Sequence, residues 1–162
     1  YFFISRSFDV AQDRMYELWT DPKLLAEWLP PAGATMRFLR TDVRVGGSSF
    51  YAMKAAGGLV FHGRVTYLAL EKPQCIVYTQ QFCDEHENVT RHPMAPTWPE
   101  TMRTVVTLTE EGPAQTRVTV TWAPHGAVTA EELATFHSAK GGMAQGWTGS
   151  FDKLEEYLAR GG

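Results

Sequence analysis

Residues 129–159 predict one long helix whose apolar side is interrupted by glycine. The large apolar residues recur at three- and four-residue steps and form one stripe, which comprises Leu133, Phe136, Met143, Trp147, Phe151, Leu154 and Leu158. Thr129 and Glu132 have the spacing of a capping box at the start of this helix. Four glycines follow inside it, at Gly141, Gly142, Gly146 and Gly149. Each costs about 1 kcal/mol relative to alanine in a helix interior, so we expect a close neighbour or open space there.

The rest of the chain is mostly typical of strands. The opening residues 1–8 predict a first strand rather than a signal peptide. Two short helices follow, the first capped by Asp9 and the second starting at Asp21-Pro22 and stopped by Pro30-Pro31. Alternating apolar and polar residues then predict strands at 36–42, 49–54, 59–70, 76–82, 102–109 and 117–122. Strands joined by short turns indicate an antiparallel meander under the long helix, which is an α+β fold.

Length and charge narrow the class of protein. A chain of 162 residues without a repeat or composition shift predicts a single domain over 1–162. Its 15 basic and 18 acidic side chains are scattered, which argues against nucleic acid or an anionic membrane as partners. No apolar run approaches the ~20 residues that span a bilayer. Cys75 and Cys83 bracket a predicted strand and lie too far apart for a disulfide, so free thiols and a cytoplasmic location are expected.

An ordered set of short motifs resembles one known family. The set comprises Trp19-Thr20-Asp21-Pro22 with Trp28, Pro31-Ala32-Gly33, Asp42-Val43-Arg44-Val45-Gly46-Gly47 before a strand ending in Met53, Gly63, Glu71-Lys72-Pro73 before Tyr78-Thr79, and Gly146-Trp147 with Leu154. Together they are similar to the START-like (SRPBCC) superfamily, in the branch of the activator of the heat-shock chaperone ATPase. The resemblance implies a helix-grip fold, in which a curved antiparallel β-sheet wraps around the long C-terminal α-helix and two short helices close one end. It also implies a cavity between sheet and helix.

Two positions depart from the pattern of this family, and both would alter the mouth of the cavity. Leu29 stands where a second aromatic residue usually follows Trp28, and the loop 84–100 is longer than usual. This loop is either a lid or a decorated loop in which Trp98 packs locally. Gly63, inside a strand, fits a close approach of the helix to the sheet.

Strand alternation turns an aromatic and methionine-rich set of side chains toward the helix. Its predicted ligand-binding members are Trp28, Tyr51, Met53, Phe61, Tyr67, Tyr78, Met102, Trp122, Phe136, Met143 and Trp147. Such a lining fits a small hydrophobic or amphipathic molecule, including an aromatic one. A filled core without a ligand is the alternative.

Motifs for other chemistry are weak. The histidines lack metal-ligand spacing, and the stretch 84–87 with His92 is typical of a solvated acidic loop, so neither a metal nor a cofactor is expected. Asp42 and Arg44 are expected to form an ion pair rather than a catalytic pair. Proton transfer would have to come from Tyr51, Tyr67, Tyr78 or His137.

The sequence therefore leaves three functions open. The first is ligand binding, for which the sequence names no specific molecule. The second is an enzyme of the cyclase, dehydratase or hydrolase type that acts on an aromatic or polyketide-like substrate. The third is a partner module for a chaperone ATPase. An exposed edge strand or the loop around Trp98 could also support a homodimer, and the sequence does not decide the oligomeric state.

Overall fold

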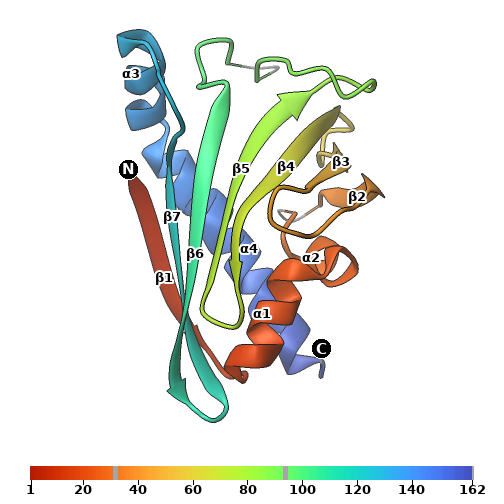
Figure 1. Ribbon diagram of the computed structural model, residues 1–162, viewed down its shortest axis with the longest axis vertical. Helices are drawn as coiled ribbons and strands as arrows, with labels where there is room; N and C mark the ends of the chain where they lie inside the picture. The colour runs from red at the N-terminus through yellow and green to blue at the C-terminus, as the bar shows by residue number, and fades with distance from the viewer. Residues whose placement is uncertain (31–32, 93–94, 162) are drawn as a thin grey trace.

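A seven-stranded antiparallel sheet with the order β1-β7-β6-β5-β4-β3-β2 forms one layer of the protein (Figure 1). The computed structural model describes residues 1–30, 33–92 and 95–161. Its strands are β1 (Phe2–Phe8), β2 (Thr35–Arg40), β3 (Ser48–Lys54), β4 (Val60–Glu71), β5 (Cys75–Cys83), β6 (Thr101–Gly112) and β7 (Gln115–Pro124). Its helices are α1 (Gln12–Thr20), α2 (Pro22–Trp28), α3 (Ala130–Ser138) and α4 (Lys140–Ala159). The predicted helix-grip architecture and its antiparallel meander are confirmed.

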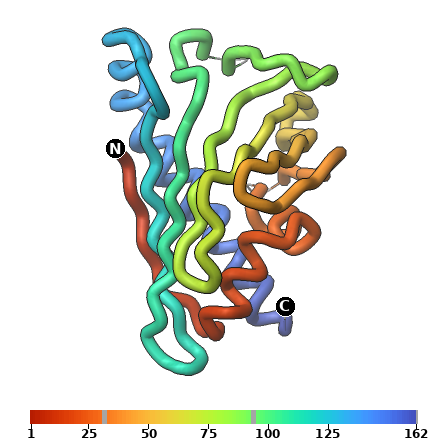
Figure 2. Tube along the Cα trace, viewed as in Figure 1, coloured from red at the N-terminus to blue at the C-terminus, as the bar shows by residue number. Residues whose placement is uncertain are grey.

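The sheet bends around α4, which crosses one of its faces obliquely (Figures 1 and 2). Strand pairing shifts register between Phe38 and Arg40, between Tyr67 and Ala69, and between Glu110 and Gly112. An extra residue at such a bulge bends the strand and increases its twist. The strands that β-propensity predicts therefore form a curved surface rather than a flat one.

The two short helices begin in different ways. The Asp21 side chain accepts a hydrogen bond from the Lys23 backbone N–H at 3.0 Å, and Pro22 occupies the first position of α2, as predicted. The predicted cap of α1 by Asp9 is wrong, because Ala11 is the N-cap and no side chain among the described residues caps this helix. Of the predicted stop for α2, Pro31 lies outside the described residues.

The predicted C-terminal helix is two helices rather than one. The capping box starts α3 as expected, because Thr129 Oγ1 accepts from the Glu132 N–H at 3.0 Å and Glu132 Oε1 accepts from the Thr129 N–H at 2.9 Å. The chain then turns at Ala139, with φ −88° and ψ −1°, and α4 starts at Lys140. Glycines directly after the break favour helix poorly, which fits an interruption there. Leu133, placed in the predicted apolar stripe, is 40% exposed on α3.

Trp147 of α4 joins two hydrophobic clusters. One cluster lies under α1 and α2 and includes Trp19 and Phe151, and the other includes Trp98 and Phe136. The Trp147 side chain packs against both clusters. Burial of apolar area on both sides of one ring ties α4 to the sheet and to the short helices.

Gly63 on β4 lies opposite Tyr51 on the neighbouring strand β3. A methyl group at Gly63 would collide with the ring and hydroxyl of Tyr51 on the paired position of β3, not with a helix. The predicted approach of the helix at Gly63 is therefore wrong, and the glycine makes room for a cross-strand tyrosine.

Cys75 and Cys83 stand at the two ends of β5 as free thiols, as predicted. None of the helices in the described residues has the length and apolarity that crossing a bilayer requires.

Gly63→Ala is expected to lower the free energy of unfolding by about 1–3 kcal/mol, because the new methyl group displaces the Tyr51 ring. Urea denaturation followed by circular dichroism measures this loss. The same substitution in a Tyr51→Ala background should cost nothing further. An equal loss in both backgrounds would mean that another neighbour opposes the methyl group.

Candidate functional site

A cavity of about 470 Å³ lies between the inner face of the sheet and α4. We call it the larger cavity. Its wall is mostly aromatic and aliphatic and consists of Trp19, Leu25, Leu29, Met36, Phe38, Tyr51, Met53, Val65, Tyr67, Ile76, Tyr78, Gln80, His92, Trp122, Gly142, Met143, Gly146, Trp147 and Ser150. This volume falls within the range of small-molecule sites.

A second cavity of about 280 Å³ adjoins the first toward the loop 84–100. The two share wall residues from β3, β5, β7 and α4, and we call the second one the smaller cavity. The loop contributes Trp98, Pro99 and Glu100 to its wall, and β6 contributes Met102. Both walls are mainly apolar, and the loop adds the carboxylate of Glu100 to the smaller cavity.

The structure brings most of the predicted binding residues together. Those in the wall of the larger cavity are Tyr51, Met53, Tyr67, Tyr78, Trp122, Met143 and Trp147. Met102 lies in the wall of the smaller cavity. These side chains come from strands β3 to β7 and from α4.

Three predicted binding residues lie outside both walls. Trp28 is fully buried and donates its indole N–H to the Leu18 carbonyl at 3.1 Å, which makes it a core residue behind Trp19. Phe61 packs against the Phe82 ring at 5.7 Å between centroids. Phe136 is fully buried in the cluster of Trp98. Strand alternation and helix periodicity identify the inward face but not whether a residue on it reaches open space.

Other wall residues were missed by sequence reasoning. Met36 and Phe38 alternate on the edge strand β2, so period-two alternation carried a signal for them. His92 lies in the irregular loop, where no periodicity exists to place it. His137, named as a proton-transfer candidate, is exposed on α3 and lies outside both walls.

The face of α4 toward the cavities alternates small and large residues. It presents Gly142, Met143, Gly146, Trp147 and Ser150, which follow one another at short helical steps along one side, and the N-cap residue Ala139 precedes them. A methyl group at Gly142 or Gly146 would meet no atom within 4 Å. Of the two expectations for the helix glycines, the structure therefore supports open space rather than a close neighbour.

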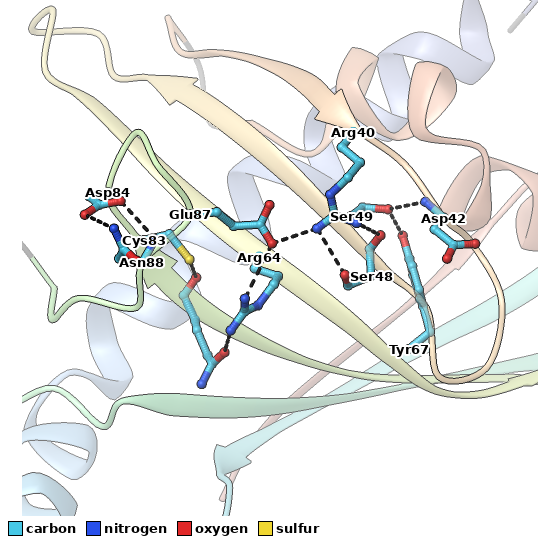
Figure 3. Close-up of polar contacts among 11 residues, drawn as sticks. Arg40, Asp42, Ser48, Ser49, Arg64, Tyr67, Cys83, Asp84, Glu87 and Asn88 are labelled. Atoms are coloured by element: carbon cyan, nitrogen blue, oxygen red, sulfur yellow. Dashed lines mark hydrogen bonds and ion pairs between the residues drawn. The ribbon is translucent and has the colours of Figure 1, made fainter.

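The tyrosine hydroxyls of the wall differ in their surroundings. The Tyr67 hydroxyl lies 3.0 Å from Ser49 Oγ, which in turn accepts from the Asp42 backbone N–H at 3.4 Å (Figure 3). Burial raises the pKa of Tyr78, and a hydrogen bond with Thr104 offsets part of that rise. Burial also raises the pKa of Tyr51, to about 12. These hydroxyls stay protonated at neutral pH, which makes them weak acid–base catalysts there.

Ion pairs of Glu87 and Arg91 help to hold the loop 84–100 to the rest of the protein. Near its start, Glu87 lies between Arg40 of β2 and Arg64 of β4, at 2.7 and 3.4 Å (Figure 3). Farther along, Arg91 pairs with Glu132 of α3 at 2.5 Å. Trp98 is 9% exposed, packs against Trp122 and Phe136, and forms part of the wall of the smaller cavity.

Charged and metal-binding groups are sparse at the site. Among residues 1–30, 33–92 and 95–161, no three His, Cys, Asp or Glu side chains converge as metal ligands would. Burial lowers the pKa of His92, which keeps its imidazole neutral at neutral pH. Asp84 of the acidic loop accepts from the backbone N–H groups of His86 and Asn88 and so shapes a turn. Asp42 and Arg44 form the expected ion pair, at 2.9 Å.

Comparisons with known proteins extend over nearly the whole chain. The family model described as Activator of Hsp90 ATPase homolog 1-like protein matches residues 9–159. The comparison with curated proteins gives no match.

Solved structures share the fold at low sequence identity. Protein Ms6760 from Mycobacterium smegmatis is 22% identical, with 96% of this chain and 88% of that chain covered and a TM-score of 0.73. A protein from Arthrobacter aurescens is 22% identical, with coverage of 98% and 85% and a TM-score of 0.81. The AHSA1 protein from Silicibacter pomeroyi is 18% identical, with coverage of 99% and 98% and a TM-score of 0.74. At these identities the likeness concerns the fold.

The pKa of Tyr51 predicts a loss of stability in alkali. Its value of about 12 in the folded protein exceeds the ordinary value of 10.0. The folded state therefore disfavours the ionised form of the hydroxyl relative to the unfolded state, and the neutral form adds to the free energy of unfolding. This contribution is complete below pH ~10 and disappears as the pH rises to ~12. Tyr51→Phe should therefore flatten the fall in unfolding free energy across this window, by up to about 2 kcal/mol.

Urea denaturation at a series of pH values measures the effect. Tyr1→Phe is the matched control, because the Tyr1 side chain is exposed and should keep the parent slope. If the unfolding free energy of Tyr51→Phe falls with pH as steeply as that of the parent, the pKa of Tyr51 is the same in the folded and unfolded states.

Proposed function

The chain belongs to the Activator of Hsp90 ATPase homolog 1-like family, and we propose that it binds a small hydrophobic or amphipathic molecule between the sheet and α4. The observation that carries this proposal is the larger cavity of about 470 Å³ with its aromatic and aliphatic wall. Cavities of this size and composition are the usual form of small-molecule sites. Protein cores, by contrast, are close-packed and leave few voids larger than a water molecule.

The glycines of α4 support a ligand site over a filled core. Gly142 and Gly146 face the larger cavity, and neither would place a methyl group near another atom. Alanine at either position would stabilise the helix by about 1 kcal/mol without a steric penalty. Glycine at these positions leaves space in the wall at the cost of helix stability, a pattern expected where the space has a use.

The wall favours binding over proton transfer. The pKa of Tyr51 and that of Tyr78 are raised by burial, and the Tyr67 hydroxyl is engaged with Ser49. A general acid or base works best with a pKa near the working pH, which none of these tyrosines offers at neutral pH. We therefore place ligand binding ahead of the enzymatic alternative.

Gly146→Leu should fill part of the larger cavity and weaken binding of an apolar probe. N-phenyl-1-naphthylamine, a neutral dye that fluoresces in apolar surroundings, is a suitable probe. We expect its affinity for the variant to fall about tenfold or more, because a leucine side chain overpacks the space that the probe needs. The melting temperature should stay the same or rise, since leucine favours helix more than glycine does.

Gly141→Leu is the matched control. Gly141 is also a glycine of α4 at which an added methyl group would meet no atom within 4 Å, but it lies outside both cavity walls. This variant should bind the dye within about twofold of the parent, as expected for a surface substitution. Failure of the parent to bind the dye, or equal binding by Gly146→Leu, would contradict the proposed function.

A further inference from the structure

Two tryptophans in the wall of the larger cavity have indole N–H groups for which the described residues supply no acceptor. The Nε1 atoms of Trp19 and Trp122 are buried, and neither has a hydrogen-bond partner within the described part of the chain. Trp19 as a whole is only 4% exposed. Trp28 behaves differently, because its N–H donates to the Leu18 carbonyl. Buried donors are nearly always paired in folded proteins, so two orphans in one cavity wall need an explanation.

Both indoles stand beside the same ring. Trp19 stacks on Trp147 with ring centroids 6.0 Å apart, and Trp122 meets Trp147 edge-on at 6.3 Å. A molecule of one or two rings next to Trp147 is therefore within reach of both indoles. Because both Nε1 atoms are buried, donation to a ligand requires the indole ring to turn its N–H edge toward the cavity that it lines.

The larger cavity offers no counter-charge to an ion. Within the described residues, its wall contains no Lys, Arg, Asp or Glu. The hydroxyl of Ser150 already donates to the Leu29 carbonyl at 2.6 Å. A charged group placed there would lose its hydration without a partner, which is strongly unfavourable. Glu100, in the wall of the smaller cavity, would also repel a carboxylate at that end.

We propose that the ligand of the larger cavity is uncharged and carries a hydrogen-bond acceptor, such as a ketone, ester or amide carbonyl, that is bound by the indole N–H of Trp19 or Trp122. This inference rests on the proposed function, since it names the chemical class that the same cavity selects. A carbonyl oxygen would satisfy a donor that the protein leaves unpaired. A purely apolar molecule would leave the donor unsatisfied, and a carboxylate would bring an unpaired charge.

Three probes with the same naphthalene body separate these classes. They are 2-acetonaphthalene, which carries a neutral carbonyl, 2-ethylnaphthalene, which lacks an acceptor, and 2-naphthoate, which is ionised at neutral pH. We expect the ketone to bind about fivefold or more tightly than the hydrocarbon, as one additional hydrogen bond predicts. The carboxylate should bind more weakly than the ketone.

Indole resonances of the protein labelled with ¹⁵N-tryptophan report which donor is used. Binding of the ketone should move the Trp19 or Trp122 N–H proton downfield, while Trp28, whose N–H is already bonded, serves as the internal reference. The corresponding Trp→Phe variant should bring the ratio of the affinities for the ketone and for 2-ethylnaphthalene, both measured on that variant, close to one, because phenylalanine retains an aromatic ring in the wall but has no N–H donor.

The outcomes distinguish the two proposals. Equal or tighter binding of 2-ethylnaphthalene, or tightest binding of 2-naphthoate, would overturn the inference about the acceptor while the cavity remains a ligand site. Binding of the ketone without a shift at Trp19 or Trp122 would overturn the role of the indoles. No binding of any of the three probes by the parent protein would overturn the proposed function itself.

Discussion

The packing of Trp147 between two hydrophobic clusters is the contact on which the rest of the architecture depends. A single helix must cover a strongly bent sheet, and one large ring reaches the cluster under α1 and α2 as well as the cluster at Trp98. The helix can be held by so few large residues because they lie one turn apart, at Met143, Trp147 and Phe151. Gly142 and Gly146 stand between them in the cavity wall, and this alternation leaves a cavity where a uniform apolar stripe would give a filled core.

Much of the fold could be predicted because its signals are local. Asp21 caps α2 and Pro22 occupies its first position, so this helix is started by residues at its own N-terminus. Thr129 and Glu132 start α3 in the same way through their capping box, and period-two alternation indicates the strands. The errors concern features that distant contacts decide. Asp9 has the chemistry of a cap, but α1 starts beyond it, with Ala11 as its N-cap. The partner of Gly63 is a ring on the neighbouring strand, which depends on the pairing register of β3 and β4. The break at Ala139 likewise separates two helices that the apolar spacing alone would join.

The same distinction applies to the candidate site. The sequence predicts which side of a strand or helix faces inward, but not whether a side chain on that side reaches the cavity. Alternation correctly turned Tyr51, Tyr67 and Tyr78 inward, and the structure places them in one wall. Helix periodicity could not tell that Trp28 and Phe136, on equally apolar faces, are enclosed by other side chains before they reach open space. The contribution of the loop could not be predicted either. His92 and Trp98 reach the cavities because the loop is tied to the sheet by Glu87 and to α3 by Arg91, and ion pairs so distant in sequence leave no periodic pattern.

The polar groups of the cavity wall fall into two classes, those that are hydrogen-bonded within the protein and those that have no such bond among the described residues. The hydroxyl of Tyr67 is hydrogen-bonded to Ser49, and Ser150 donates to the Leu29 carbonyl, so each serves the protein itself. The indole groups of Trp19 and Trp122 are buried without such a partner in the described residues. Evolution tolerates an unsatisfied buried donor poorly unless something offsets its cost. A wall that excludes charge and leaves two indole donors unpaired within the described residues therefore carries more information about its ligand than its apolar area does. Apolar area favours almost any hydrophobic molecule, whereas an unpaired donor discriminates among them.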